Sequence, residues 1–516
     1  MNKDFPRTHP LGEAIQAENN RQSKALAVDT FDGKIHVEWD PTAAVTPIGQ
    51  LPFFIQFLKA GGLFDRWVDQ SPLRYKSNNA PKKRDVLGSF LLSVLSGHNR
   101  YAHMTSLIND QVNTQLLDMR KVVSDDSARR ALNRIDETDG VSWLQNHLQR
   151  CYEPLLTQDW ILDADVTVKP LYGHQEGAEL GYNPQKRGRP SHAYHTYMVA
   201  NLRLILDVEV QAGNCTASCH SAPGLWALLD RLPSDCLPHF IRGDCDWGVD
   251  DVMRTAEERG MPYLFKLRKS KNVKSLINQA HCTPGWTYTT AGWEALESEL
   301  QLPLWDRARR VVVIRRRLPK ETIVALESQK AGQTGLGFVD EPEDIRTFEY
   351  AVLVTSLPSE VISIVCHYRD RADCENNFDE IKNQWGWGGF TTRAIKPCRF
   401  MSRIIALVYN WWSIFVRLAE PDKHLEAVTS RPLLLSSVGK LTASGRQKTL
   451  TITHSHGRAQ QVQKTYQRVQ LFFDDLSAIA PQLSELECWC RILSEAMKKY
   501  LGGTILKPPN HYTLSQ

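Results

Sequence analysis

The first part of the chain carries the spacing of apolar side chains that predicts helices. Between Asp85 and Ser96, apolar residues recur at intervals of one, three and four positions, which places them on one face of a helix. A second helix is predicted after Ser124, because Asp125 and Asp126 stand where acidic side chains favour the first turn. The residues before this helical region are polar and irregular, and we expect them to form a flexible arm.

The spacing changes to a period of two at Trp160, which predicts a β-strand. In WILDADVTVKPL, apolar side chains alternate with Asp163, Asp165 and Thr167, so the two sets lie on opposite faces of the strand. Further strands are predicted at 194–201, at 202–210, in a run ending at Asp244 and in MPYLFKL, with helices at 224–232 and 249–259. This order predicts an α/β fold built on a mixed sheet.

The remaining sequence divides into three parts. Residues 268–347 are β-rich and contain VVVIRRRL, and we expect a separate module inserted into the sheet domain. The strand YAVLVTS and one long helix over 359–384 resume the α/β pattern, and the chain from 421 is mixed and then helical. The predicted organisation is a flexible arm (1–35), a helical N-terminal domain (36–155), an α/β core in two parts (156–267 and 348–420), a β-rich insertion (268–347) and a C-terminal domain (421–516).

Composition narrows the class of protein without identifying it. The 516 residues hold 62 Lys and Arg against 58 Asp and Glu, and the net charge of +4 does not by itself indicate a nucleic-acid partner. The 11 cysteines and the lack of a leader pattern or a long apolar run predict a reduced, cytoplasmic protein with no membrane partner. Cys215, Cys219 and His220 could bind a metal, but reduced thiols explain them better. No phosphate-binding glycine loop occurs, so we expect no dependence on ATP.

Two aspartates stand near the ends of predicted strands, where a carboxylate is costly unless something pairs it. Asp165 lies on one such strand, and Asp244 ends another after an apolar run. In a mixed sheet the two strand ends can lie side by side, and one or two carboxylates are enough to bind Mg²⁺. Helix capping or turn formation explains most such aspartates, so both interpretations stay open.

The predicted helix over 359–384 carries a stripe of polar side chains. The stripe consists of Tyr368, Arg371, Glu375 and Lys382. At ~100° per residue, these positions fall within an arc of about 60° on the helix surface. A surface stripe of i, i+4 ion pairs accounts for Arg371 and Glu375 but gives no role to the other two. A carboxylate flanked by cations suits a phosphodiester site, where the carboxylate completes a metal site and the cations hold the backbone.

These motifs resemble those of a known family. The stretch YRDRADCENNFDEIK has the Tyr-x2-Arg-x3-Glu-x6-Lys spacing of DDE transposases of the insertion-sequence four group. The segments LDADVTVKPLYGHQEGAELGYNPQKRGRPSH, RGDCDWG and ENNFDEIKNQWGWGGF are similar to the related thirteen-eighty insertion-sequence group. The resemblance covers roughly residues 160–415.

The resemblance implies a ribonuclease-H-like core with Asp165, Asp244 and Glu375 as catalytic, metal-binding carboxylates. Asp163 is a rival to Asp165 on the same strand face, and Asp246 stands where relatives often carry Gly, so either could assist metal binding. Tyr368, Arg371 and Lys382 would contact DNA backbone near the cleaved end. The implied cofactor is a pair of Mg²⁺ ions, with Mn²⁺ as a substitute, which stabilise the entering and leaving oxygens of an in-line attack on phosphorus.

The resemblance also implies the activity and the partners. The protein would bind the terminal inverted repeats of its element, cleave the ends by phosphodiester hydrolysis and join the 3′-OH ends to target DNA. Its partners would be double-stranded DNA, bound in part by the helical domain at 36–155, and a second copy of the chain in a paired-end complex, with the C-terminal domain at 421–516 as the candidate contact. Its location would be the cytoplasm of a bacterium, associated with the nucleoid. Two alternatives stay open: a ribonuclease-H-like nuclease that does not join ends, and a domesticated DNA-binding protein without activity.

Basic and aromatic residues elsewhere predict further contacts with DNA. The loop YNPQKRGRPSH groups Lys186, Arg187 and Arg189 around a glycine, as in a hook that enters the minor groove of A·T tracts, although a solvated hairpin is the alternative. The helix after Ser124 carries Arg129, Arg130 and Arg134, and it suits either the second helix of a helix-turn-helix or a solvated basic face. Trp385 and Trp387 could stack on an unpaired base, but packing in the core is favoured.

Overall fold

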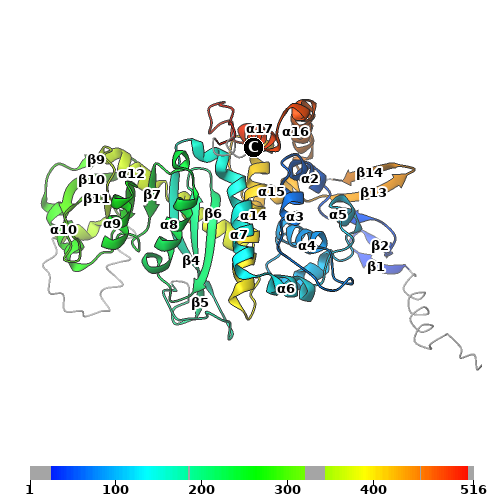
Figure 1. Ribbon diagram of the computed structural model, residues 1–516, viewed down its shortest axis with the longest axis horizontal. Coiled ribbons are helices and arrows are strands. Elements are labelled where there is room, and N and C mark those ends of the chain that lie inside the picture. The colour runs from blue at the N-terminus through cyan, green and yellow to red at the C-terminus, as the bar shows by residue number, and fades with distance from the viewer. Residues whose placement is uncertain (1–24, 184–185, 320–342, 454, 510–516) are drawn as a thin grey trace, which may run out of the picture.

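The computed structural model describes residues 25–183, 186–319, 343–453 and 455–509, and it has a mixed α/β fold. Figure 1 shows an elongated molecule in which a large sheet forms one half and helices form most of the other. The helices of the N-terminal region are α2 (Leu51–Ala60), α3 (Leu63–Asp69), α4 (Lys83–Leu95), α5 (Gln111–Leu116), α6 (Asp125–Arg134) and α7 (Glu137–Tyr152).

The N-terminal region confirms the predicted helices but not the whole of the predicted arm. The helix expected over 85–96 is α4, and the helix expected after Ser124 is α6, which Ser124 caps by accepting a hydrogen bond from the Ser127 N–H at 3.3 Å. Residues 1–24 lie outside the described residues. For the rest of the expected arm, the prediction of an irregular segment is wrong. There, β1 (Leu26–Thr30) and β2 (Gly33–Val37) pair as an antiparallel hairpin.

Nine strands form the central mixed sheet, in the order β6-β5-β4-β7-β8-β12-β11-β10-β9. The first five in this order are β6 (Leu204–Ala212), β5 (Ser191–Val199), β4 (Ile161–Pro170), β7 (Phe240–Gly243) and β8 (Tyr263–Lys266), with helices α8 (Ala222–Arg231) and α9 (Asp250–Glu258) in the connections. β7 runs parallel to both β4 and β8, whereas β5 is antiparallel to β4 and β6. The predicted mixed sheet is therefore confirmed.

The β-rich stretch expected as a separate module is continuous with this sheet. Its elements and the strand after it are α10 (Lys271–Cys282), β9 (Thr287–Tyr288), β10 (Trp293–Leu300), β11 (Arg309–Arg317) and β12 (Phe348–Thr355). β12 pairs with β8 on one side and with β11 on the other. The prediction of a separate module is therefore wrong. An alternating pattern in the sequence identifies a strand but not the strand it pairs with, and here the strands pair with the core sheet.

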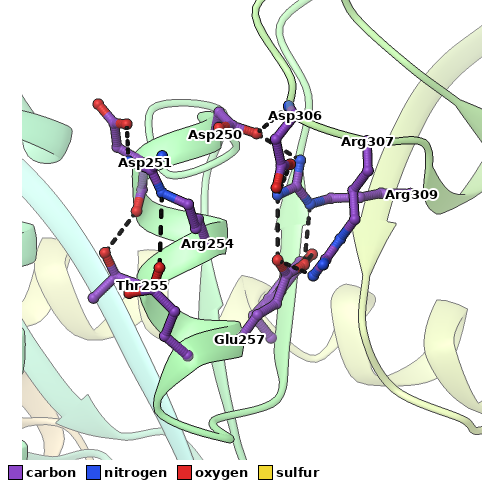
Figure 2. Close-up of polar contacts among 10 residues, drawn as sticks. Asp250, Asp251, Arg254, Thr255, Glu257, Asp306, Arg307 and Arg309 are labelled. Carbon is purple, nitrogen blue, oxygen red and sulfur yellow. Dashed lines mark hydrogen bonds and ion pairs between the residues drawn. The ribbon is translucent and has the colours of Figure 1, made fainter.

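A network of ion pairs links the start of β11 to α9. Figure 2 shows the Arg309 guanidinium among Asp250, Glu257 and Asp306. The closest nitrogen–oxygen distances to these three carboxylates are 2.7, 3.0 and 2.8 Å, respectively. The Arg309 side chain is only 3% exposed, so its charge depends on these partners. Arg254 on the same helix pairs with Asp251 at the surface.

Helix α14 (Ile395–Ala419) lies between the sheet and the remaining helices. It is buried along nearly its whole length and contacts β6 and α7 on one side and helices of both terminal regions on the other. The C-terminal region consists of α15 (Ala427–Leu434), β13 (Val438–Ser444), β14 (Gln447–Thr453), α16 (Ala459–Ile479) and α17 (Glu485–Ala496). β13 also pairs with β3 (Val45–Thr46), so the two terminal regions share a sheet. Among the described residues, no helix is apolar enough over sufficient length to cross a bilayer.

Candidate active site

The two strand-end aspartates are neighbours in the sheet. β4 and β7 run parallel, and the last pair in their register is Ala164 with Gly243. Asp165 is the next residue of β4 and Asp244 directly follows the end of β7, and adjacent strands lie about 4.8 Å apart. Each carboxylate accepts a local main-chain hydrogen bond: Asp165 from the Val166 N–H at 2.8 Å, and Asp244 from the Asp246 N–H at 2.9 Å. The parallel pairing therefore brings together two acids that are far apart in sequence.

The helix that carries the third carboxylate differs from the expectation. Instead of one helix over 359–384, there are two, α12 (Val361–Arg369) and α13 (Ala372–Gln384). At the junction, the Arg371 N–H donates to the Tyr368 carbonyl and the Cys374 N–H to the Arg371 carbonyl, an i, i+3 pattern that tightens the turn. The four polar residues therefore do not form a stripe on one continuous helix, and Tyr368 is placed independently of Glu375.

Arg371 joins the strand acids to this helix. Its Nη2 lies 2.5 Å from Asp165 Oδ2, and its Nη1 lies 3.6 Å from Glu375 Oε1. The Arg371 and Asp165 side chains are 7% and 16% exposed, whereas Glu375 is 71% exposed. Asp244 also acts electrostatically on both Asp165 and Arg371. The structure thus places Asp165 and Glu375 against one guanidinium, with Asp244 close enough to feel its charge.

Burial and like charge shape the electrostatics of this cluster. Burial raises the pKa of Asp165 to about 6, the nearby Arg371 opposes this rise, and Asp244 adds to it. Burial likewise raises the pKa of Asp244. Burial also raises the pKa of Tyr368 to about 12, so its phenol keeps its proton at neutral pH and can donate a hydrogen bond. Burial disfavours the ionised form of both carboxyl groups, and a cation bound between them would favour that form.

Asp163, the rival to Asp165, is committed to a buried ion pair. Both of its oxygens contact Arg242, at 2.5 Å from Nε and 2.7 Å from Nη2, and the two side chains are almost fully buried. Arg242 also donates to the main-chain oxygen of His367 on α12. Asp163 therefore ties β4 to β7 and α12, and its carboxylate is not open to a ligand. Sequence reasoning missed Arg242, although an arginine inside a short buried strand signals such a partner.

The second aspartate motif contains a further group of possible metal ligands. Among the described residues, the ligand atoms of Asp244, Cys245 and Asp246 lie within 4.8 Å of one another. Burial raises the pKa of the Cys245 thiol, so the oxygens of the two aspartates are the better donors for a hard cation. Asp246 is also paired with Arg268 at 2.5 Å. Asp246 thus lies where it can assist a cation held by Asp244.

The other predicted residues on and after α13 contact the protein's own main chain and core. Lys382 donates to the Val168 carbonyl of β4 at 2.7 Å, and burial lowers the pKa of its half-buried ammonium. Trp385 and Trp387 are buried, and their indole N–H groups donate to Glu380 and to the main chain of Ser402, both at 3.0 Å. The favoured interpretation of the tryptophans as core residues is confirmed.

The predicted basic residues lie in two clusters near the far end of β4. Lys186 and Arg189 both lie over the ring of Tyr172, at 4.9 and 4.7 Å from its centre, and Arg187 is exposed beside them. On α6, Arg129 pairs with Asp125 and Asp126, while Arg130 and Arg134 are exposed. The α6 helix packs on α4 and α14 through its alanines, and its role as a recognition helix stays a prediction.

Comparison with known proteins gives one match at the level of a family. The model of the family described as "Transposase DDE domain group 1" matches residues 71–473. No curated protein matches the chain. Among solved structures, a cryo-EM structure of the piggyBac transposase synaptic complex with hairpin DNA is similar at 10% sequence identity and a TM-score of 0.39, over 90% of this chain and 84% of that one.

Proposed function

Because the chain belongs to the DDE transposase family of domain group 1, we propose that it binds the terminal inverted repeats of a mobile element, cleaves the element's ends and joins them to target DNA. The observation that supports the proposal most is the position of Arg371 between Asp165 and Glu375, beside Asp244. Asp165 and Glu375 contact this one guanidinium, and Asp244 lies near it, although the oxygens of the three acids are not within 4.8 Å of one another as those of Asp244 and Asp246 are. Carboxylate oxygens suit a hard divalent cation, which would displace Arg371 and draw Glu375 inward.

We propose that Asp165, Asp244 and Glu375 hold two divalent cations, Mg²⁺ or Mn²⁺, with Asp246 in an assisting position. When bound, such ions stabilise the entering and leaving oxygens of in-line phosphoryl transfer. Arg371 would then leave Asp165 to hold a phosphate oxygen, since a guanidinium binds phosphate as well as carboxylate. The Tyr368 phenol would donate to the same backbone, and Lys382 would add positive charge beside it. No covalent link between protein and DNA is needed.

The proposed partners follow from the reaction. Double-stranded DNA would supply both the element ends and the target, and two copies of the chain would hold the two ends together. The core of β6-β5-β4-β7-β8 with α12 and α13 would be the ribonuclease-H-like catalytic unit. The basic loop at 186–189, together with Arg130 and Arg134 of α6, would hold DNA away from the cut.

The test of this function compares carboxylate variants with a matched surface acid. Asp165→Asn, Asp244→Asn and Glu375→Gln should each abolish cleavage of duplexes made from the DNA that flanks this reading frame, while binding to those duplexes persists. The control is Asp373→Asn, since Asp373 lies on α13 and pairs with Arg203 at the surface, so its loss should leave cleavage intact. Full cleavage by Glu375→Gln would refute the assignment. A second assay with pre-cut ends would distinguish a transposase, which joins them, from a nuclease, which does not.

A further inference from the structure

A large groove lies at the end of β4 away from the carboxylates. It has a volume of about 1200 Å³, and three segments that are distant in sequence line it: the exposed face of α6, the connection from Leu171 toward β5, and residues 391–394 before α14. Figure 1 shows α6, the β4–β5 connection and the start of α14 along the lower edge of the molecule. The groove is therefore a feature of the tertiary structure rather than of one loop.

Hydrogen bonds hold the three walls in place. Lys396, in the first turn of α14, donates to the main-chain oxygens of Asn133 and Ile135 at 2.9 and 3.0 Å, which fixes α14 to the end of α6. The Glu176 N–H donates to the Arg393 carbonyl at 2.8 Å, and the Glu176 carboxylate accepts from the Ile395 N–H at 3.0 Å. The groove is thus formed before any ligand arrives, which reduces the entropy lost on binding.

The side chains of the groove leave positive charge uncompensated. Arg130, Arg189 and Arg393 are exposed, one on each wall, and within the described part of the chain none of them forms an ion pair with an acidic side chain. The acids on the walls are already engaged: Asp126 pairs with Arg129 at 2.5 Å, and Glu176 caps α14. Three separated guanidinium groups with no acidic partner suit a row of phosphates better than a single small anion.

The positive surface continues past Arg130. A second hollow, which Arg130 also lines, contains Lys76 and Arg134, and the guanidinium of Arg134 lies 5.8 Å from the ring centre of Tyr75. On the opposite side, Tyr172 supports Arg189 and Lys186. The cations therefore extend in a track across α6, with aromatic rings beneath them at both ends. A track of this length fits an extended polyanion.

The groove has a fixed position relative to Asp165, because β4 leads from Asp165 directly to Leu171 at the groove. Asp165 and Leu171 are separated by six residues of β4 and its end, which at about 3.3 Å per residue is about 20 Å. Successive phosphates of one strand of B-DNA are spaced by about 3.4 Å along the helix axis, so this separation corresponds to about six nucleotides. Lys382 fixes α13 to the same strand through the Val168 carbonyl.

We propose that this groove binds the phosphate backbone of duplex DNA about six nucleotides from the phosphate at Asp165. The inference rests on the proposed function and deepens it, since it names the surface that holds the element end while the carboxylates act. Arg393, which sequence reasoning did not single out, joins Arg130 and Arg189 as a phosphate contact. Arg129, held by two aspartates, positions the wall of α6 instead of contacting DNA.

The first test measures binding without cleavage. The full-length protein is titrated onto a fluorescein-labelled duplex in EDTA, and anisotropy gives Kd between about 50 and 200 mM salt. Arg130→Ala, Arg189→Ala and Arg393→Ala should each weaken binding several-fold and reduce the slope of log Kd against log salt by about 1. The matched control is Arg254→Ala, because Arg254 is an exposed arginine of α9 that lies outside the groove, and this variant should bind as the unmodified protein does.

Further arms of the experiment separate the outcomes. Variants that bind with unchanged affinity and slope, while the unmodified protein binds the duplex, would overturn the groove assignment and leave the proposed function intact. Reduced affinity with an unchanged slope would also overturn it, because a folding defect does not alter ion release. Equal competition by unlabelled polyglutamate would show a general polyanion surface and not a DNA track. Failure of the proposed function is detected separately, by cleavage in the Glu375→Gln protein.

A crosslinking measurement tests the predicted position on DNA. Thr391 lines the groove and is exposed, so Thr391→Cys can carry a photoactivated crosslinker. On a duplex that ends at the cleavage position, crosslinks should fall about five to seven nucleotides from the end. Crosslinks confined to the terminal nucleotides, or spread evenly along the duplex, would overturn the proposed path.

Discussion

At the scale of single residues, Arg371 contacts two of the three candidate carboxylates. Its guanidinium lies 2.5 Å from Asp165 and 3.6 Å from Glu375, so it occupies space that a cation between these acids would need. A metal ion and Arg371 must therefore compete for Asp165. When no metal is bound, the positive charge of Arg371 offsets the repulsion between these carboxylates.

Removing Arg371 should tighten metal binding. We expect Arg371→Gln to bind Mn²⁺ several-fold more tightly than the unmodified protein at pH 8, which lies above the pKa of about 6 that Asp165 has with Arg371 in place. The physical reason is the loss of the competing positive charge. Calorimetric titration or Mn²⁺ electron paramagnetic resonance without DNA measures the affinity, and Arg371→Lys serves as the charge-retaining control. Equal or weaker Mn²⁺ binding by Arg371→Gln would show that the two cations do not share a site.

A second prediction at this scale concerns pH. His195 is fully buried on β5, where its Nδ1 is hydrogen-bonded to the Ser221 hydroxyl, and burial lowers its pKa to about 4. Its folded-state pKa lies below the unfolded value of about 6.5, so its contribution to stability is complete above pH 6.5 and is lost as pH falls toward 4. The contribution is of the order of 3 kcal/mol.

The urea midpoint of unfolding tests this contribution. Between pH 7.5 and about pH 4.5, the unmodified protein should lose more stability than His195→Asn, in which no imidazole is protonated on unfolding. Asn can still reach Ser221, so the comparison at pH 7.5 reports any packing defect separately. Parallel loss of stability in both proteins would show that His195 does not titrate in this range.

The sequence could predict the carboxylates but not their contacts. Asp165 and Asp244 were identifiable because an aspartate near the end of an apolar strand needs a partner, and parallel pairing then makes the two neighbours. The ion pair between Asp165 and Arg371 joins residues 206 positions apart, and no local pattern encodes such a contact. For the same reason, the commitment of Asp163 to Arg242 was visible only after β4 and β7 were placed side by side.

At the scale of elements, periodicity predicted strands and helices well but not their junctions. The alternation in β4 and the capped start of α6 are local properties, and both are confirmed. The division between α12 and α13 is not local, because the residues around Asp370 are compatible with a helix and the turn accompanies the reach of Arg371 to the sheet. Strand pairing across 268–347 was unpredictable for a similar reason, since it depends on β8 and β12.

The Arg309 network gives a prediction at this scale. Arg309→Ala should lower the free energy of unfolding by about 3 kcal/mol, because it leaves the carboxylates of Asp250, Glu257 and Asp306 without their shared buried partner. Arg254→Ala, which removes only surface pairs on the same helix, should cost less than about 1 kcal/mol. Urea unfolding measures both. Similar small losses in the two variants would mean that this network does not hold β11 to α9.

At the scale of the whole molecule, the terminal regions and the sheet share one hydrophobic core. Phe53 of α2 stacks on Tyr466 of α16 at 3.8 Å between ring centres, and the Trp489 ring of α17 packs against Phe57. Both C-terminal helices also contact α14, the central buried helix. The boundary expected at residue 421 therefore separates segments that are continuous in the core.

Truncation tests this continuity. A chain that ends at residue 420 lacks α16 and α17, so it would expose Phe53, Phe57 and part of α14 to water. We expect this fragment to aggregate or to lack cooperative thermal unfolding, as measured by size-exclusion chromatography and calorimetry. A monodisperse fragment with a sharp transition would indicate that the C-terminal region is an independent domain.

The unbroken strand β4 has a consequence for where DNA would be cut. Asp165, the acid proposed to act at the cut, lies on this strand, and the connection to the groove follows the strand's end. From Asp165 to Pro170 the strand is hydrogen-bonded to β5, so it has little freedom to stretch. Such a strand would set a fixed distance between the phosphate bound in the groove and the phosphate that is cut. The position of cleavage would then depend on this distance. A base change at the cut would therefore shift the position less than the insertion of a nucleotide between the two phosphates.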